Sequence, residues 1–104
     1  MRSRNLESIL NHHIATIKFV KKTNGTVRHM MCTRSKKILT RFPELGYMQS
    51  GIDIFKPRTD YPYNSKSHEN VVVWDLMTRD VRQIWARTCV VEKLIHEDDF
   101  KGLV

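Results

Sequence analysis

Residues 14–33 read IATIKFVKKTNGTVRHMMCT, and this stretch decides the fold. Two extended runs flank Asn24-Gly25, which is the strongest short signal for a β-hairpin. A type I′ turn centred on these two residues places Phe19 opposite Met30. Side chains alternate along a strand, so one apolar face is formed by Ala15, Ile17, Phe19, Met30 and Cys32. We therefore expect a hairpin over residues 14–33.

The same register places two cations opposite each other near the tip of the hairpin. Lys21 faces Arg28, and Lys22 adjoins them. Like charges that are directly opposed destabilise a hairpin by roughly 0.2–1 kcal/mol. Two interpretations stay open: the tip keeps these cations for an anion, or long side chains splay into water at little cost.

The positive charge of the chain lies almost entirely in residues 1–41. This part carries ten Lys or Arg and one acid, a formal charge of +9, whereas residues 42–104 carry eight basic and ten acidic side chains. The whole chain has a net charge of +7. Such a split predicts a polyanionic partner, with nucleic acid as the first choice.

The segments around the hairpin predict a few short elements. Residues 3–13 have helical spacing of apolar side chains, with Ser3 as the expected cap. Residues 35–42 (SKKILTRF) predict one or two helical turns that end at Pro43. Residues 50–70 form a long connection with two prolines, and loops of this length are usually functional or disordered.

Residues 71–91 predict a second hairpin, with a turn at Met77–Asp80 and with Trp74 and Trp85 as large core or rim side chains. Together, one helix and about five short strands in 104 residues predict a single domain, mainly β (α+β). A small barrel is favoured because closure removes exposed strand edges. A small α+β sheet is the alternative.

Two stretches resemble a known family. Residues 19–33 resemble the F-x-K-x-[DN]-G-x-x-R-x-M-x-x-T hairpin of a family of small tailed-bacteriophage proteins of unknown function. Residues 73–76 (VWDL) and 81–84 (VRQI) resemble its closing hairpin, V-[FW]-D followed by W-R-S-F, with Val81 where the family tends to have Trp. The family is described as an Sm-like or SH3-like β-barrel related to WYL-type domains. The resemblance implies a phage origin, such a barrel and no catalytic residue.

The residue patterns point away from an enzyme and from a metal or cofactor site. No histidine pairs with a cysteine at the spacing of metal ligands, and the four glycines are not clustered as in phosphate-binding loops. Cys32 and Cys89 are expected to be reduced core thiols. The chain has no apolar run of about 18 residues, and its N-terminus lacks a hydrophobic signal core. These features predict an intracellular protein, and with the resemblance they predict the cytoplasm of an infected bacterium.

The candidate nucleic-acid-binding residues are cations of the leading part and two tyrosines of the long loop. They are Lys18, Lys21, Lys22, Arg28, Arg34, Lys36, Lys37, Arg41, Tyr61 and Tyr63. A helix over residues 34–41 would place Arg34, Lys37 and Arg41 on one face. The tyrosines either stack on bases or pin the loop to the core. We expect the cations to gather on one outward surface that binds the phosphates of DNA or RNA in a salt-dependent manner.

A second hypothesis uses the same basic face. A small phage barrel can inhibit or modulate a host protein of the transcription, translation, nuclease or defence machinery by docking on an acidic patch. Strand pairing between copies could also make a homo-oligomer.

Overall fold

The first hairpin has the predicted apolar face but a register shifted by two residues. The computed structural model describes residues 2–21, 24–55 and 70–101, and in it β1 (Ile14–Val20) pairs antiparallel with β2 (Val27–Thr33). Phe19 lies opposite Arg28 and Ile17 lies opposite Met30, so the predicted Phe19–Met30 pairing is wrong. A shift of two residues returns each side chain to the same face, which is why the apolar face is preserved.

The connection at the tip is longer than the predicted two-residue turn. The Lys21 amide donates to the Thr26 carbonyl at 2.8 Å, and the Gly25 amide donates to the Lys21 carbonyl at 2.9 Å. Gly25 adopts a φ of +68°, and the Asn24 side chain accepts a hydrogen bond from the Thr26 amide at 3.0 Å. The prediction that Lys21 faces Arg28 is therefore wrong, because the hairpin closes between residues 21 and 26.

Three further strands complete one sheet in the order β4-β3-β2-β1-β5. They are β3 (Asn70–Asp75), β4 (Asp80–Trp85) and β5 (Val90–Ile95). β3 and β4 form the second hairpin, but its predicted end at residue 91 is wrong. The 3-10 turn η3 (Ala86–Thr88) breaks the run, and β5 pairs with β1 instead. The Thr88 hydroxyl accepts a hydrogen bond from the Val20 amide at 3.2 Å and fixes η3 to the end of β1.

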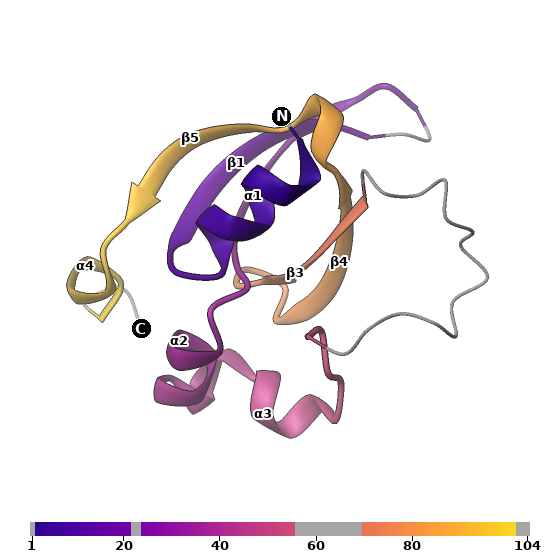
Figure 1. The fold of residues 1–104 in the computed structure, drawn as a ribbon. Coiled ribbons are helices and arrows are strands. Elements are labelled where there is room, and N and C mark those ends of the chain that lie inside the picture. The colour runs from indigo at the N-terminus through magenta and orange to yellow at the C-terminus, as the bar shows by residue number, and fades with distance from the viewer. Residues whose placement is uncertain (1, 22–23, 56–69, 102–104) are drawn as a thin grey trace.

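The sheet curls around α1 (Ser3–Leu10), as Figure 1 shows. α1 contributes Leu6 and Leu10, both with no exposed surface, to the inner core. The other buried members of this core are Ala15, Ile17, Cys32, Val71, Val73, Ile84, Ala86 and Cys89. α1 ends earlier than the predicted residue 13, and Arg2 rather than Ser3 occupies its N-cap position. The fold is mainly β (α+β), as the sequence predicted: one five-stranded antiparallel sheet, curled like a small barrel, with a short N-terminal helix.

The opposite face of the sheet is covered by α2 (Lys36–Arg41), η1 (Pro43–Leu45) and α3 (Tyr47–Ser50). Pro43 follows the end of α2, as predicted. The outer core is formed by Ile14, Ile38, Leu39, Phe42, Leu45, Tyr47, Ile54, Val72, Trp74 and Leu76. The Trp74 indole donates to the Leu45 carbonyl at 2.9 Å, which joins β3 to η1. β3 therefore has one face in each core.

The final helix, α4 (Glu97–Lys101), follows β5. No helix within the described ranges has the length and apolar character needed to cross a membrane. Most of the predicted 50–70 connection, residues 56–69, lies outside the described residues.

Replacing Leu10 with alanine tests whether α1 is an integral part of the barrel. Because Leu10 is fully buried, we expect the free energy of unfolding to fall by roughly 2–5 kcal/mol. Chemical denaturation measures this change. Leu94→Ala is the matched control, because Leu94 is 48% exposed and its truncation should change stability by less than about 1 kcal/mol. Equal losses in the two variants would contradict the assignment of α1 to the core.

Candidate nucleic-acid interface

The first hairpin is longer than the strand it packs beside, and this leaves one end of the barrel open. β2 pairs with β3 only at Cys32–Asp75 and Thr33–Trp74. The Leu76 amide donates a hydrogen bond to the Met31 carbonyl at 2.9 Å. Residues 76–79 then form the turn that leads from β3 into β4. Residues 27–30 of β2 extend past this turn. An opening, which we call the barrel mouth, therefore lies between the outer half of the hairpin and β4.

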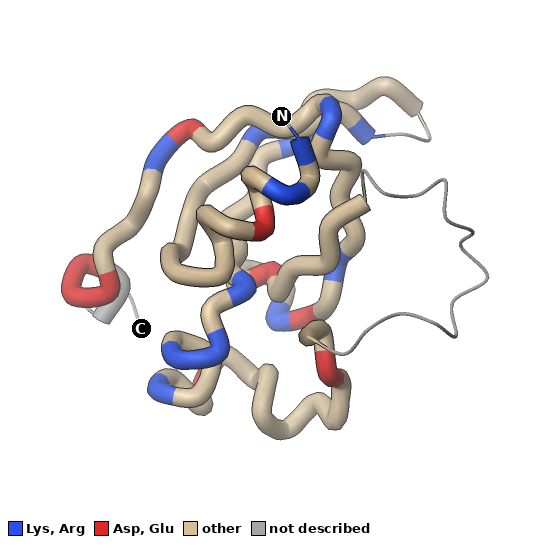
Figure 2. Tube along the Cα trace, in the orientation of Figure 1, with Lys and Arg blue, Asp and Glu red and all other residues tan. Residues whose placement is uncertain are grey.

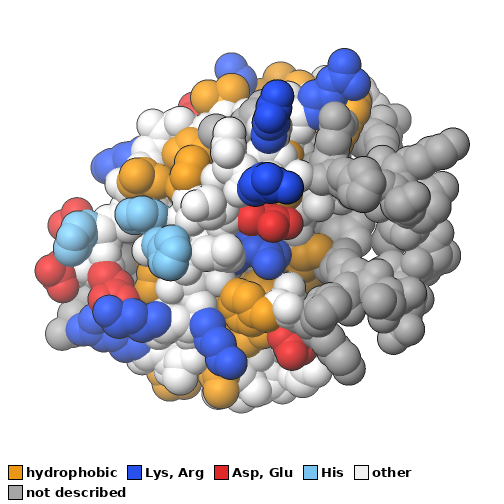
Figure 3. Space-filling model, viewed as in Figure 1, with side chains coloured by type: hydrophobic (Ala, Val, Ile, Leu, Met, Phe, Trp, Pro, Cys, Tyr) orange, Lys and Arg blue, Asp and Glu red, His pale blue; other side chains and the backbone are white. Residues whose placement is uncertain are grey.

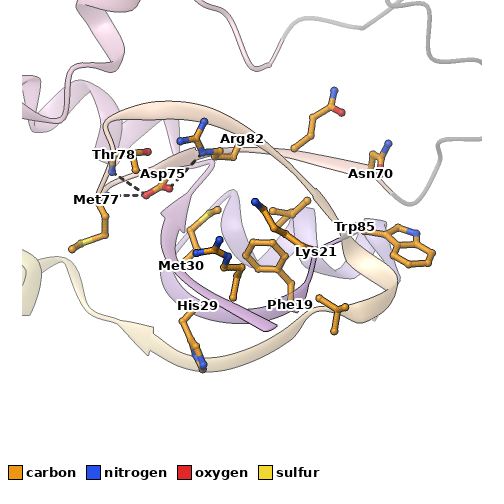
Figure 4. Close-up of a pocket in the computed structure, with 14 residues that line it drawn as sticks. Phe19, Lys21, His29, Met30, Asn70, Asp75, Met77, Thr78, Arg82 and Trp85 are labelled. Atoms are coloured by element: carbon orange, nitrogen blue, oxygen red, sulfur yellow. Dashed lines mark hydrogen bonds and ion pairs between the residues drawn. The ribbon is translucent and has the colours of Figure 1, made fainter. Parts of the chain in front are cut away.

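The barrel mouth holds a pocket of about 810 Å³ with an apolar floor and cations among its lining residues. Phe19, Met30 and Ile84 supply the apolar lining, and Lys21, Arg28 and Arg82 supply the positive charge. Figure 4 shows Phe19 and Lys21 in the middle of the pocket, with Asp75 and Arg82 at one end and Asn70 and Trp85 at the other.

The positions of the central side chains follow from strand geometry. Phe19 and Lys21 are two residues apart, so they point to the same side of the hairpin. Arg28 lies directly opposite Phe19 in the ladder. Lys21 and Arg28 are exposed, and within the described residues neither makes an ion pair. Their positive charge is therefore uncompensated beside the apolar floor.

One carboxylate, that of Asp75, also lines the pocket, and its role is structural. Asp75 is 6% exposed, and its Oδ1 accepts hydrogen bonds from the amides of Met77 at 2.9 Å and Thr78 at 3.2 Å. Its Oδ2 lies 3.9 Å from Arg82 Nε, and Arg82 also lies 3.5 Å from Asp80. Arg82 is thus partly neutralised, whereas the charges of Lys21 and Arg28 are not.

Lys18 points away from the pocket. It lies on the other face of β1 from Phe19, between His29 of β2 and Val90 of β5. On that face His29 Nδ1 lies 2.8 Å from Glu92 Oε1. Lys18 can therefore add to the local positive potential but cannot contact a molecule held in the barrel mouth.

The cations around α2 form a separate group. Lys36 and Lys37 are exposed, and Arg41 lies 2.5 Å from Glu97 of α4. Arg34 precedes the helix and has structural bonds: it donates to the Val72 carbonyl and, at 3.1 Å, to the Asn11 side chain. The predicted shared face of Arg34, Lys37 and Arg41 is therefore wrong.

The single basic surface expected from the sequence is likewise wrong, because the described cations form two groups. The hairpin tip and α2 lie at opposite ends of β2, which separates them by about 20 Å at 3.3 Å per residue. Figure 2 shows blue segments at the hairpin tip and on α2, on opposite sides of the molecule. On the face shown in Figure 3, blue side chains alternate with white, orange and red ones. Lys22, Tyr61 and Tyr63 lie outside the described residues.

Sequence reasoning missed two residues of the pocket, Phe19 as its floor and Arg82 as a cation. Phe19 was assigned to the core, but it is only half-buried. Arg82 belongs to the part of the chain with a net negative charge, so the charge distribution did not indicate it as a binding residue. The signal was present in the alternation of β4, because Arg82 is two residues before the buried Ile84 and shares its face.

Cys32 and Cys89 are buried in the inner core of the protein. Cys32 lies on the same face of β2 as Met30, which lines the pocket. Burial, assisted by the nearby Cys89 and Asp75, raises the pKa of Cys32 far above its ordinary value of 9.0. Burial raises the pKa of Cys89 to about 11. Both cysteines are protonated at neutral pH, and a thiol rather than a thiolate is a poor nucleophile. The pocket therefore holds no activated cysteine.

Comparisons with known proteins identify no relative. No protein-family model, curated protein or solved structure matches the chain.

The buried thiols give a prediction for cysteine chemistry. At about pH 8 the native protein should not react with a thiol reagent, and both cysteines should react after unfolding. Ionisation of the thiols favours the unfolded chain because their pKa values are raised in the fold. The free energy of unfolding should accordingly fall as the pH rises from the ordinary value of 9.0 to about 11. Rapid labelling of either cysteine in the native state would show that the inner core is open.

Proposed function

We propose that this protein binds nucleic acid without enzymatic chemistry, through the cations of the barrel mouth. The observation that carries the proposal is the placement of Lys21 and Arg28, which have no acidic partner within the described residues, at a concave pocket. Phosphate groups neutralise such cations and release counterions. Binding in the cytoplasm of an infected bacterium, as the family resemblance implies, is part of the same proposal.

The structure supports the hairpin tip over α2 as the main contact. Cations that only increase solubility are usually scattered over a convex surface. Lys21 and Arg28 instead adjoin a pocket with an apolar floor. In the α2 group, Arg41 is paired with Glu97 and Arg34 is used to hold β3. Only Lys36 and Lys37 of that group are exposed without an ion pair in the described part of the chain. The stacking role of Tyr61 and Tyr63 stays a prediction.

The double variant Lys21→Ala/Arg28→Ala tests the proposal. We expect tighter binding of random DNA or RNA at low salt than at physiological salt, and a marked loss of affinity in the variant. Each phosphate contact that is lost should reduce the slope of log K against log salt by about 0.7–0.9. Fluorescence anisotropy with labelled oligonucleotides over a salt series measures both quantities.

Lys36→Ala/Lys37→Ala is the matched control, because it removes the same number of exposed charges from the other group. We expect a smaller loss of affinity and a smaller change of slope than at the barrel mouth. A larger loss in the control would place the interface on α2. If no nucleic acid binds at low salt and one host protein is recovered by an affinity pull-down, the host-protein hypothesis replaces the proposal.

A further inference from the structure

We infer that the barrel mouth receives an unpaired base, so that the preferred nucleic acid is a single strand rather than a duplex. The inference rests on the proposed function and names its substrate class. It is carried by an aromatic floor that no described residue covers, together with the cations beside it.

At the barrel mouth, the apolar side chains of the inner core are only partly covered. Leu6 and Leu10 of α1 cover the inner face where Ala15, Ile17 and Cys32 lie, and these residues have no exposed surface. Further along the same face, Phe19 and Met30 pack against the core but are only partly buried. An apolar side chain left half-exposed inside a concave site is a surface on which a flat apolar group can pack.

The neighbouring charges determine which flat group fits. Lys21 is two residues from Phe19 on the same strand face, a spacing of about 7 Å, and Arg28 lies about 5 Å away across the ladder. A nucleotide carries an apolar base face and a phosphate within one unit. Phe19 can therefore stack on the base while Lys21 and Arg28 contact the phosphate attached to it. A neutral aromatic ligand would use the floor and leave both cations unpaired.

The concave shape of the pocket favours an unpaired base over a paired one. An unpaired base has a free apolar face and free polar edges, and a concave pocket can take up both. In a duplex these edges are paired and the bases are stacked within the helix. A duplex therefore presents only phosphates to the barrel mouth, and Phe19 adds nothing to its affinity.

Three ligands with the same number of phosphates separate base binding from phosphate binding. They are a single-stranded oligothymidine, a strand of the same length in which every nucleotide is abasic, and a duplex of equal total charge. At one fixed salt concentration we expect the oligothymidine to bind roughly tenfold or more tightly than the other two, as stacking of one base on an aromatic side chain predicts. Thymidine monophosphate in competition tests whether a free nucleotide is the source of the base.

Phe19→Leu tests the floor while it keeps most of the apolar volume. We expect roughly a tenfold loss of affinity for oligothymidine and no change for the abasic strand or the duplex. Phe55→Leu is the matched control, because Phe55 is also half-buried but packs in the outer core, where its ring lies 6.1 Å from that of Tyr47. Its affinities should equal those of the parent. Thermal melting of both variants shows whether any loss is due to unfolding.

The outcomes distinguish the inference from the proposed function. Equal binding of the abasic strand and the oligothymidine, with unchanged affinity in Phe19→Leu, overturns the inference and leaves phosphate binding intact. If thymidine monophosphate competes with an affinity equal to that of the oligothymidine, the ligand of the barrel mouth is a free nucleotide and not a single strand. Failure of all these ligands to bind at low salt removes the proposed function itself.

Discussion

The burial of both faces of β3 is the constraint on which the rest of the structure depends. Val71 and Val73 fill the inner core under α1, whereas Val72 and Trp74 fill the outer core under α2, η1 and α3. A strand that is apolar on both sides needs a cover on each, since exposing either face would cost about 25 cal/mol for each Å² of apolar surface. α1 is therefore required on one side of the sheet, and α2, η1 and α3 are required on the other.

The sequence predicted those parts of the fold that depend on local periodicity. Alternation along residues 14–33 identified the apolar face correctly even though the register was wrong, because a shift of two residues preserves the face. The exact pairing depends on the turn, and Asn24-Gly25 resembled a two-residue turn although the chain closes at Lys21 and Thr26. The hydrogen bond between those two residues is not encoded in any short pattern.

Other features depend on contacts between distant segments, which no local pattern reports. The run from Val81 to Val91 has the composition of one strand, yet η3 divides it because Thr88 bonds to the end of β1, 68 residues earlier in the chain. Arg34 resembled one member of a basic helical face, but it lies before α2 and bonds to Val72 and Asn11. The separation of the cations into two groups follows from the same cause. The number of charged residues in a stretch of sequence does not show at which end of a strand each of them lies.

The open end of the barrel is a direct result of unequal hairpin lengths. β2 runs past the point where β3 turns into β4, so the residues that line the inner face there have a neighbour on one side only. In a domain selected for stability alone, apolar side chains would close that end, because leaving Phe19 and Met30 half-exposed forgoes burial and placing uncompensated Lys21 and Arg28 beside them adds repulsion. Both departures from an optimal core occur at the same few residues. A ligand that is at once flat, apolar and anionic would remove both of them, which is the physical argument for a nucleotide at this position.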